Sequence, residues 1–306
     1  MPADAIVLDG PAALRTSGVV RRLAHNPTVV FGIVILGLIV AIGIAAPWLA
    51  NFDPAAINPA FRNKTPGAVE SVRADDGTRI ELRHWMGTDS LGRDVASRVV
   101  YGARASLLVG VSVAVIAVSI GLAIGLAAGY VRLLDAIVMR LMDGLMAIPA
   151  ILLAIAVVSL SSAGLIAVIV AIVIPEVPRV VRLVRSIVLS VREEPYVEAA
   201  IAVGTPSLPL VIRHILPNTI PPLIVQATYI CASAILIEAI LSFLGVGIPA
   251  QTPTWGNIMA EGRTLFRVYP HNILYPGILL ALTVLAVNLL GDGLRDTLDP
   301  RMRKSL

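Results

Sequence analysis

A few ionisable side chains stand inside long apolar runs of this sequence, and they are the first candidates for chemistry. Hydrophobic residues make up 57% of the 306 residues and charged residues only 14%, whereas soluble domains carry about 25% charged residues. A charged side chain in a membrane-spanning helix is costly and is a functional hypothesis by default. The candidates for a polar pathway or a moving part, with one proline that would bend a helix, are Arg140, Asp143, Pro149, Glu176, Arg179 and Glu238.

Each of these charges also has a structural interpretation. Arg140 and Asp143 stand three residues apart and can pair on one helix face, as can Glu176 and Arg179. Glu238 falls near the outer end of its predicted helix, where it would face a pathway or pair with an outer arginine. The residues alone leave both interpretations open.

Catalytic and cofactor motifs are missing from the sequence. It contains no Gly-x-x-x-x-Gly-Lys-Ser/Thr phosphate loop, no His-Glu-x-x-His and no Gly-x-Ser-x-Gly, the usual signatures of nucleotide, zinc and serine-hydrolase sites. The single Cys231 lies in an apolar run, and the spacing of His84, Asp89 and Asp94 matches no metal motif. The sequence therefore predicts no catalytic residue, no metal site and no cofactor bound by this chain.

The apolar runs predict an all-α membrane protein with six spans. About 20 apolar residues in a helix cross the hydrocarbon core, and four charge-free runs are long enough: 26–52, 105–131, 215–237 and 272–291. A fifth run, 144–175, is too long for one span and has a polar middle, so we interpret it as a hairpin of two helices beginning near Ile137.

Arginine and lysine predict the orientation of these spans. With the long loop 51–104 set aside, only Arg263 and Arg267 lie on the side opposite the N-terminus. Basic residues concentrate in cytoplasmic loops. Both termini are therefore predicted to be cytoplasmic.

The polar segment 51–104 predicts a small outer structure. Val69–Arg73 and Thr78–Leu82 alternate polar with apolar residues around Ala74-Asp-Asp-Gly77, which indicates a β-hairpin. The hairpin would cap the helix ends or dock an external partner. Beyond it, Leu91, Val95 and Val99 recur at helical spacing, with polar residues opposite them, which predicts an interfacial helix before the second span. The polar residues of this predicted helix are Arg93, Asp94, Ser97 and Arg98.

Two backbone signals bear on packing. Gly121, Gly125 and Gly129 recur every fourth residue and leave a flat stripe where another helix can approach closely. Pro149 removes one backbone hydrogen bond and should bend its helix, either as a hinge or as a static kink.

The segment 193–217 interrupts the apolar pattern with two short helices. Pro195 suits the first position of a helix, and Gly204 suits its left-handed end. Thr205 would cap the second helix, with Pro206 at its first position, and Pro217 would end that helix or start the next span. The result would be a compact cytoplasmic projection for a partner, or a hairpin resting on lipid headgroups.

The spacing Glu198-Ala-Ala200, Gly204, Leu216-Pro217 resembles the EAA loop of bacterial type I ABC importer permeases. His214 departs from the consensus, which has isoleucine there. Further stretches resemble the C-type permease of the dipeptide/oligopeptide/nickel branch over about residues 28–301. They are Gly87–Asp94, Ser97-Arg98, Tyr101–Arg104, Arg213–Asn218, Leu241–Gly245, Trp255-Gly-Asn257 and Asn288–Arg301.

The resemblance implies the type I importer fold of six transmembrane helices with a small extracytoplasmic hairpin. The expected parts are a cytoplasmic tail (1–27), a first span (28–50), an outer loop (51–104), a five-helix core (101–292) with the coupling loop (193–217), and a cytoplasmic tail (293–306). In this family the loop seats in a groove of an ATPase. The ATPase-coupling role therefore passes to Glu198, Ala199, Ala200, Gly204, Leu216 and Pro217.

The resemblance also implies partners and a location. They are a homologous second permease forming a heterodimer, two ABC ATPases that use ATP and Mg, and an extracytoplasmic solute-binding protein, at the bacterial inner membrane. The expected function is import of peptides or a related small solute, with nickel, glutathione, opine or sugar as alternative cargo. Glu176 and Arg179, where the family more often has neutral residues, and the long outer loop argue against assuming the commonest solute or receptor.

Two interpretations from other classes stay open. A membrane scaffold would recruit a cytoplasmic partner through the same segment 193–217 without transporting anything. A membrane enzyme is third, because no nucleophile or metal cluster can be assembled from the sequence.

Overall fold

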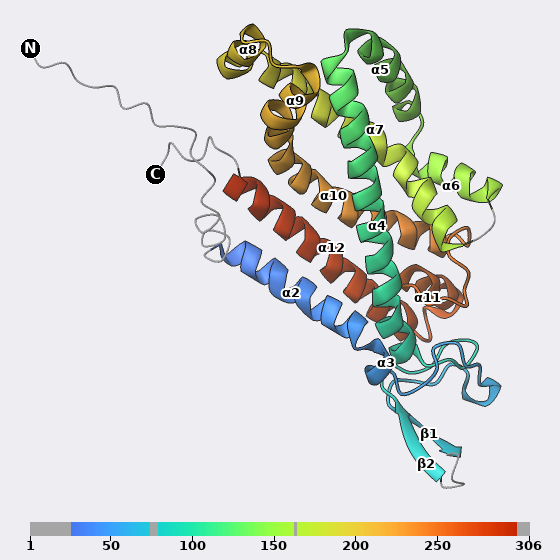
Figure 1. Cartoon of the computed structure of the whole chain (residues 1–306). Coiled ribbons are helices and arrows are strands. Elements are labelled where there is room, and N and C mark those ends of the chain that lie inside the picture. The colour runs from blue at the N-terminus through green and yellow to red at the C-terminus, as the bar shows by residue number, and fades with distance from the viewer. Residues whose placement is uncertain (1–25, 74–78, 162–163, 299–306) are drawn as a thin grey trace, which may run out of the picture.

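Long apolar runs become long helices in this chain, because a helix satisfies its backbone polar groups within one segment. The computed structural model describes residues 26–73, 79–161 and 164–298, and Figure 1 shows a helical bundle with a small sheet at one end. The long helices are α2 (Pro27–Ile44), α4 (Val95–Tyr130), α5 (Arg132–Met146), α6 (Ala150–Leu160), α7 (Leu165–Arg192), α10 (Leu216–Phe243) and α12 (His271–Leu298). Shorter elements are α3 (Ala46–Leu49), η1 (Pro59–Phe61), α8 (Pro195–Ala202), α9 (Ser207–Leu210), η2 (Val211–Ile215), α11 (Trp255–Gly262) and η3 (Arg263–Leu265).

Six spans are compatible with these helices. Among the described residues, α2, α4, α12 and the continuous segment Ser207–Phe243 are long and apolar enough to cross a membrane. α5 and α6 make a fifth candidate if the bent pair is one span. α7 has 28 residues but carries Glu176, Arg179 and Arg182 in its middle, so composition alone does not identify it as the sixth.

α4 and α7 pack along a seam of glycine against valine. The pairs are Gly121 with Val180, Gly125 with Val184 and Gly129 with Val188. At the second and third pairs, a Cβ atom built on the glycine would lie 2.7 Å from the valine Cβ. The glycine stripe therefore brings the two helices to a separation that a larger side chain would prevent.

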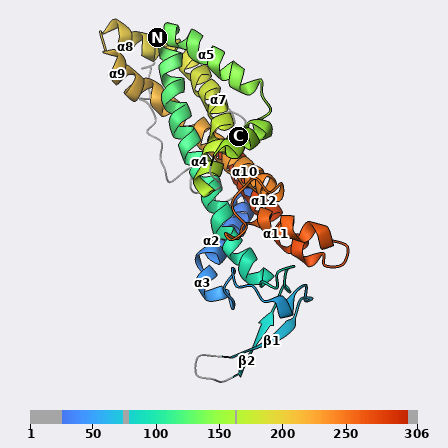
Figure 2. The ribbon, with the colours of Figure 1, turned by 90° about the vertical axis from the view of Figure 1, so that its right-hand side faces the viewer.

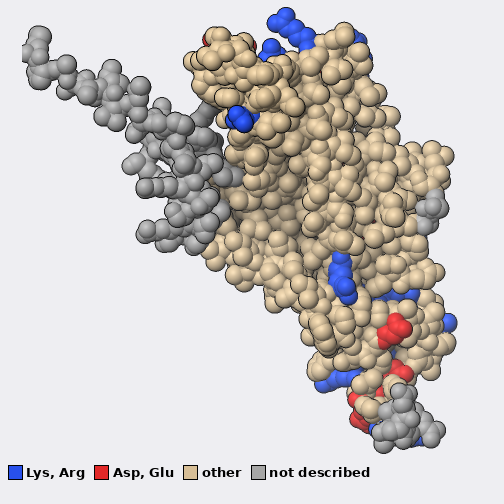
Figure 3. Space-filling model, viewed as in Figure 1, with Lys and Arg blue, Asp and Glu red and all other residues tan. Residues whose placement is uncertain are grey.

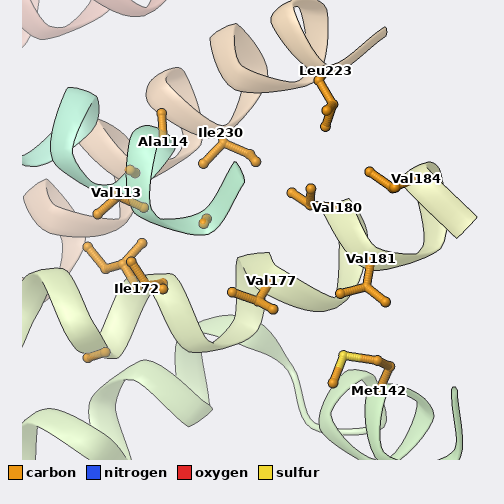
Figure 4. Packing of buried hydrophobic residues seen from close by; sticks show 14 of the residues in the cluster. Val113, Ala114, Met142, Ile172, Val177, Val180, Val181, Val184, Leu223 and Ile230 are labelled. Atoms are coloured by element: carbon orange, nitrogen blue, oxygen red, sulfur yellow. The ribbon is translucent and has the colours of Figure 1, made fainter. Parts of the chain in front are cut away.

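α7 lies at the centre of the main hydrophobic core. Figure 4 shows Ala114 of α4 and Ile230 of α10 on one side of α7, and Met142 of α5 on the other. Pro175 and Pro178 stand inside α7 without ending it, and both are buried. Membrane helices tolerate proline where neighbouring helices cover the freed backbone groups.

A sharp bend separates α5 from α6, at the position predicted for Pro149. The two helices meet at 88°, and Pro149 is the N-cap of α6. The predicted pair of Arg140 with Asp143 is wrong, because Asp143 instead pairs with Arg182 of α7. The bend leaves α5 alongside α7, so that Asp135 and Asp143 of α5 lie within reach of the α7 arginines.

The outer end carries the predicted hairpin, which projects from the bundle in Figure 2. β1 (Ala68–Arg73) and β2 (Arg79–His84) are antiparallel, with Ala68 opposite His84. The turn predicted at Ala74–Gly77 lies outside the described residues.

The predicted separate interfacial helix is wrong. Its residues from Val95 onward are the first turns of α4, which runs without a break to Tyr130. Its polar residues are buried rather than solvated, because they bind one another and α11. These buried residues are Arg93, Asp94, Ser97 and Arg98.

On the face shown in Figure 3, charged side chains lie toward the two ends of the bundle. On the face in Figure 3, a broad band without charged atoms crosses the middle of the bundle. Exposed apolar side chains on α2, including Phe31, Val34 and Leu38, fit a helix in contact with lipid.

Substitution in the glycine seam tests its role in holding α4 to α7. Gly125→Leu should lower the apparent Tm of the detergent-solubilised protein, because overpacking a filled site costs about 1–3 kcal/mol. The matched control is Gly37→Leu in α2, where a Cβ meets nothing within 4 Å. Both changes replace glycine in a helix, which by propensity alone favours leucine. Equal Tm values for the two variants would contradict the seam.

Candidate functional site

The segment that interrupts the apolar chain forms an angular projection at the end of the bundle opposite the hairpin (Figures 1 and 2). α8 begins at Pro195, with Glu194 as its N-cap. It ends at Ala202 with Val203 as its C-cap, and the next residue, Gly204, has a φ of +85°. The amide of Gly204 donates to the carbonyl of Ile201 at 2.9 Å, and that of Thr205 donates to the carbonyl of Ala200 at 3.0 Å. These two bonds form a Schellman motif, which requires the left-handed conformation that glycine adopts without strain.

The second half of the segment does not stop at Pro217. α9 (Ser207–Leu210) continues through the π-helical turns of η2 (Val211–Ile215) directly into α10. The predicted cap at Thr205 is absent, since the N-cap residue of α9 is Pro206, which makes no side-chain hydrogen bond. The wider π-helical turn accommodates Pro217, which has no amide hydrogen to donate and would crowd a regular turn. Pro217 therefore lies in the first turn of α10, which confirms the predicted alternative that it starts the next span.

His214 joins α8 to this π-helical turn. Its ring stacks on the ring of Tyr196 at a centroid distance of 6.5 Å. The side-chain amide of Asn218 donates to the hydroxyl of Tyr196 at 3.1 Å and to the backbone carbonyl of His214 at 2.7 Å. Val197, on the inner side of α8, is fully buried. α8 is thus attached to η2 and the beginning of α10 by stacking and hydrogen bonds.

The outer surface of the projection is apolar and exposed. Val203 is 87% exposed and Leu208 is 69% exposed. Glu198 and Ala199 are also exposed. Tyr196, Ile201 and Ile212 complete this patch of exposed side chains, which we call the α8 patch. A contiguous apolar patch rimmed by polar residues marks an interaction surface.

A cavity opens beside the α8 patch. Its volume is about 540 Å³, and its lining includes Arg132, Asp135, Arg192 and Glu198. Nη1 of Arg192 donates to the carbonyls of Gly129 and Tyr130, both at 3.3 Å. A cation at these terminal carbonyls stabilises the helix end. Arg192 therefore ties the end of α7 to the end of α4 immediately before α8.

At the opposite end, Asp89 organises the loop before α4. Its Oδ1 accepts from the amides of Leu91 and Arg93 at 2.8 and 3.0 Å, and its Oδ2 accepts from Nε of Arg93 at 2.7 Å. Arg93 and Arg98 also pair with Glu261 of α11. Burial raises the pKa of Glu261, while Arg98 and Arg93 act in the opposite direction. We call Asp89, Arg93, Arg98 and Glu261 the outer ion cluster.

His84 links the hairpin to the start of α4. Its Nδ1 lies 2.8 Å from Oδ1 of Asp94, and its Nε2 lies 3.0 Å from Oε2 of Glu70. The Phe52 ring stacks on the imidazole at 4.2 Å. Asp94 also caps α4 by accepting from the amide of Ser97 at 2.7 Å. The hairpin and the start of α4 are therefore connected through one buried side chain.

The Trp255-Gly-Asn257 stretch anchors α11 against the bundle. Nε1 of Trp255 donates to the carbonyl of Val99 at 3.0 Å. The Asn257 side-chain amide donates to the carbonyls of Ile248, Pro249 and Thr252 at 2.9–3.3 Å. These bonds fix the loop between α10 and α11, so the stretch has a positioning role at the outer end.

Glu238 is fully buried in α10. Ser242 donates to its Oε1 at 2.8 Å, and Ser106 of α4 donates to its Oε2 at 3.4 Å. Among the described residues, no arginine or lysine pairs with it. The predicted alternative of an outer arginine partner is wrong, and in this conformation the carboxyl group joins α4 to α10 rather than facing an open pathway.

The other ionisable candidates lie on α7 and α5. Glu176 is buried and pairs with Arg179 at 2.9 Å, as the spacing predicted. Arg185 binds Asp135 of α5, with Nη2 at 2.7 Å from Oδ2. Arg140 is exposed on α5.

Comparison with known proteins decides the family. Residues 105–304 match the family described as the binding-protein-dependent transport system inner membrane component. Residues 16–66 match the N-terminal TM domain of oligopeptide transport permease C. The chain belongs to this transport family. The permease is thus a multi-pass inner-membrane subunit of an ABC importer, in agreement with the expected fold and with the C-type resemblance.

Relatives and solved structures agree with this family. The permease is 52% identical over 296 residues to a probable peptide ABC transporter permease protein of Sinorhizobium fredii, covering 96% of each chain. It is 41% identical to a dipeptide transport system permease protein of Alkalihalophilus pseudofirmus, covering 92% of this chain and 89% of that one. The inward-facing MetNI methionine ABC transporter shares its fold, with a TM-score of 0.52 at 20% identity over 66% of this chain and 96% of the other.

Sequence reasoning missed the contacts that hold these regions together. Arg98 and Glu261 are 163 residues apart, so no local pattern reports their pairing. The spacing of Asp89 and Arg93 at i and i+4 was a usable signal for an ion pair. No sequence pattern indicated that Tyr196 would stack on His214 and bind the side chain of Asn218.

Removal of one carboxylate tests the outer ion cluster. Glu261→Gln should destabilise the permease by about 3 kcal/mol, because breaking the buried pairs leaves two guanidinium groups, those of Arg93 and Arg98, to share the carboxylate of Asp89. The apparent Tm in detergent measures the effect. Glu81→Gln, on an exposed strand position, makes the same chemical change and should leave Tm unaltered. A Glu261→Gln protein as stable as this control would refute the cluster's structural role.

A second pair of variants tests the role of Glu238. Its contacts with Ser106 and Ser242 need hydrogen-bonding atoms rather than a charge, so Glu238→Gln should leave folding and uptake near wild type. Glu238→Leu removes those atoms and should cost about 1–3 kcal/mol, the penalty for unsatisfied buried hydroxyls. Uptake by the reconstituted importer and Tm in detergent distinguish the two variants. Loss of uptake in a fully stable Glu238→Gln protein would restore a pathway role.

Proposed function

We propose that this permease forms half of the translocation pathway of a peptide importer, paired with a homologous second permease. The observation that supports a peptide as the imported solute is the 52% identity to a relative named as a probable peptide permease. A relative from Pectobacterium atrosepticum named as a glutathione transport system permease is 38% identical. Glutathione, itself a small peptide, is therefore the second candidate.

We further propose that the α8 patch is the surface that binds a cytoplasmic ATPase. The support is its exposed apolar side chains, with Glu198 and Ala199 exposed beside them. The patch lies at the end of the bundle that is predicted to be cytoplasmic. ATP and Mg would be used by the two ATPases, since this sequence has no phosphate loop. Glu198, Ala199, Ala200 and Gly204 belong to the contact region, whereas Leu216 and Pro217 connect it to α10.

The contacts of α8 supply a route from the ATPase to the membrane. Tyr196 attaches α8 to the start of α10 through Asn218, and Arg192 attaches the preceding end of α7 to α4. A displacement of α8 would move these three helices together. ATP would then select between two conformations of the bundle because it binds the ATPases more tightly in one of them.

An orientation in the membrane is part of the same proposal. Both termini and the α8 patch lie on the cytoplasmic side in this proposal, and the β1–β2 hairpin lies outside. The extracytoplasmic solute-binding protein would approach the hairpin end, where His84 and the outer ion cluster connect the hairpin and α11 to α4. A cap without a docking role is the other interpretation of the hairpin.

Reconstitution tests the whole proposal. The permease is co-expressed with candidate second permease, ATPases and binding protein, purified as a complex, and placed in proteoliposomes containing ATP. Import of radiolabelled di- and tripeptides that depends on ATP and on the binding protein is expected. A complex that assembles but imports no peptide would instead favour a scaffold, and glutathione uptake alone would select the second candidate.

The conformation of Gly204 gives a sharper test of coupling. A Cβ on Gly204 meets nothing within 4 Å, but the φ of +85° strains any β-branched residue. Gly204→Val should therefore abolish uptake while ATP hydrolysis by the complex continues and membrane insertion is normal. Gly204→Asn should retain most uptake, since asparagine tolerates this conformation.

Gly144→Val is the matched position control. Its Cβ would also meet nothing within 4 Å, and it has no positive φ. This variant should import peptides as the wild type does. Wild-type uptake by the Gly204→Val complex would show that the proposed coupling segment is not required.

A further inference from the structure

Arg179 lies near the midpoint of α7, about 20 Å along the helix from either end at 1.5 Å per residue. Its side chain is 46% exposed, while that of Glu176 is only 1% exposed. In the proposed six-span orientation α7 is the remaining span, and an arginine at its midpoint is strongly disfavoured against lipid. The exposed edge of Arg179 therefore requires water or a polar partner.

The contacts of Arg179 occupy only one end of its guanidinium group. Nη1 donates to Oε1 and Oε2 of Glu176 at 2.9 and 3.0 Å, and Ser233 of α10 donates to Oε1 at 3.3 Å. Nε and Nη2 make no hydrogen bond to any residue that the structure describes. Together they form the planar fork that binds a carboxylate through two parallel hydrogen bonds.

The next two arginines of α7 already hold carboxylates. Arg182 pairs with Asp143, and Arg185 pairs with Asp135, both from α5. Arg185 uses the same two nitrogens, Nε and Nη2, for its carboxylate. Arg179 therefore presents, at the midpoint of α7, the fork that Arg185 uses nearer the end of the helix that leads to α8.

We propose that Arg179 is a solute-binding residue of the translocation pathway, and that its Nε and Nη2 receive a carboxylate of the passing solute. This rests on the proposed function, because a peptide with a free C-terminus supplies the carboxylate. Glu176 holds the guanidinium in position through Nη1 and balances its charge. The negative charge of Glu176 weakens the binding of the solute carboxylate to Arg179. Weak binding suits a pathway, because the solute must be able to leave each site.

A carboxylate of the second permease would fit the same fork. A solute would come and go, whereas a partner side chain would cover Arg179 permanently in the assembled complex. Accessibility and protection by solute therefore separate the two occupants.

The experiment uses the complete reconstituted complex in a Cys231→Ala background, which removes the only cysteine of this chain. Arg179→Cys is treated with the water-soluble reagent sulfonatoethyl methanethiosulfonate, with and without a peptide that the wild type imports. Val170→Cys is the matched control, because Val170 is 47% exposed on the same helix but lies about 180° around it.

Rapid labelling at position 179, slowed by the peptide, is expected, with little labelling at position 170. The Glu176→Gln/Arg179→Gln double variant removes both charges without leaving either buried alone. It should import the peptide about tenfold more slowly, the worth of a hydrogen bond to a charged group. Its ATPase activity stimulated by the loaded binding protein should stay at the wild-type level.

Two results would overturn the assignment of Arg179. One is a cysteine at 179 that the reagent cannot reach in the complex, which would place the second permease or lipid there. The other is normal import by the double variant. Wild-type import is measured in parallel, so a wild-type complex that imports no peptide counts against the proposed function and not against Arg179.

Discussion

The close approach of α4 and α7 is the contact on which the rest of the structure depends. Glycine at positions 121, 125 and 129 lets the valines of α7 lie against the α4 backbone. This contact holds the arginine-bearing half of α7 beside α4 and directs its end toward α8. Between membrane helices there is little hydrophobic driving force, so close packing must supply much of the association.

Charge placement follows from the same arrangement. Acidic residues of α5 reach Arg182 and Arg185 because the bend after Met146 leaves α5 alongside α7. At the outer end, Glu261 adds a second carboxylate to that of Asp89, so that two buried arginines face two carboxylates. Arg179 differs because its partner, Glu176, engages only Nη1. A polar fork left open at the midpoint of α7 is costly against lipid, and solute transport gives a reason for it to exist.

Much of the fold could be predicted from local patterns. Apolar runs predicted α2, α4, α10 and α12, and alternation with an Asp-Gly turn predicted the hairpin. Pro149 predicted the bend, and Pro195 with Gly204 predicted the ends of α8. Predictions were wrong where distant residues decide the environment. Arg93 and Arg98 are buried and pair with the carboxylate of Glu261 on α11. Asp143 pairs with Arg182 of α7 instead of its near neighbour Arg140.

The sequence by itself determined that this is a multi-pass membrane protein, placed its helices and identified the segment resembling the coupling loop. These features depend on hydrophobicity, proline and glycine, which act over a few residues. Only the tertiary structure decided which charges are satisfied, how His214 stacks on Tyr196 to attach α8 to α10, and which nitrogens of Arg179 stay open. Those outcomes depend on contacts between separate helices, because each hydrogen bond or ion pair requires a geometry that helix packing sets.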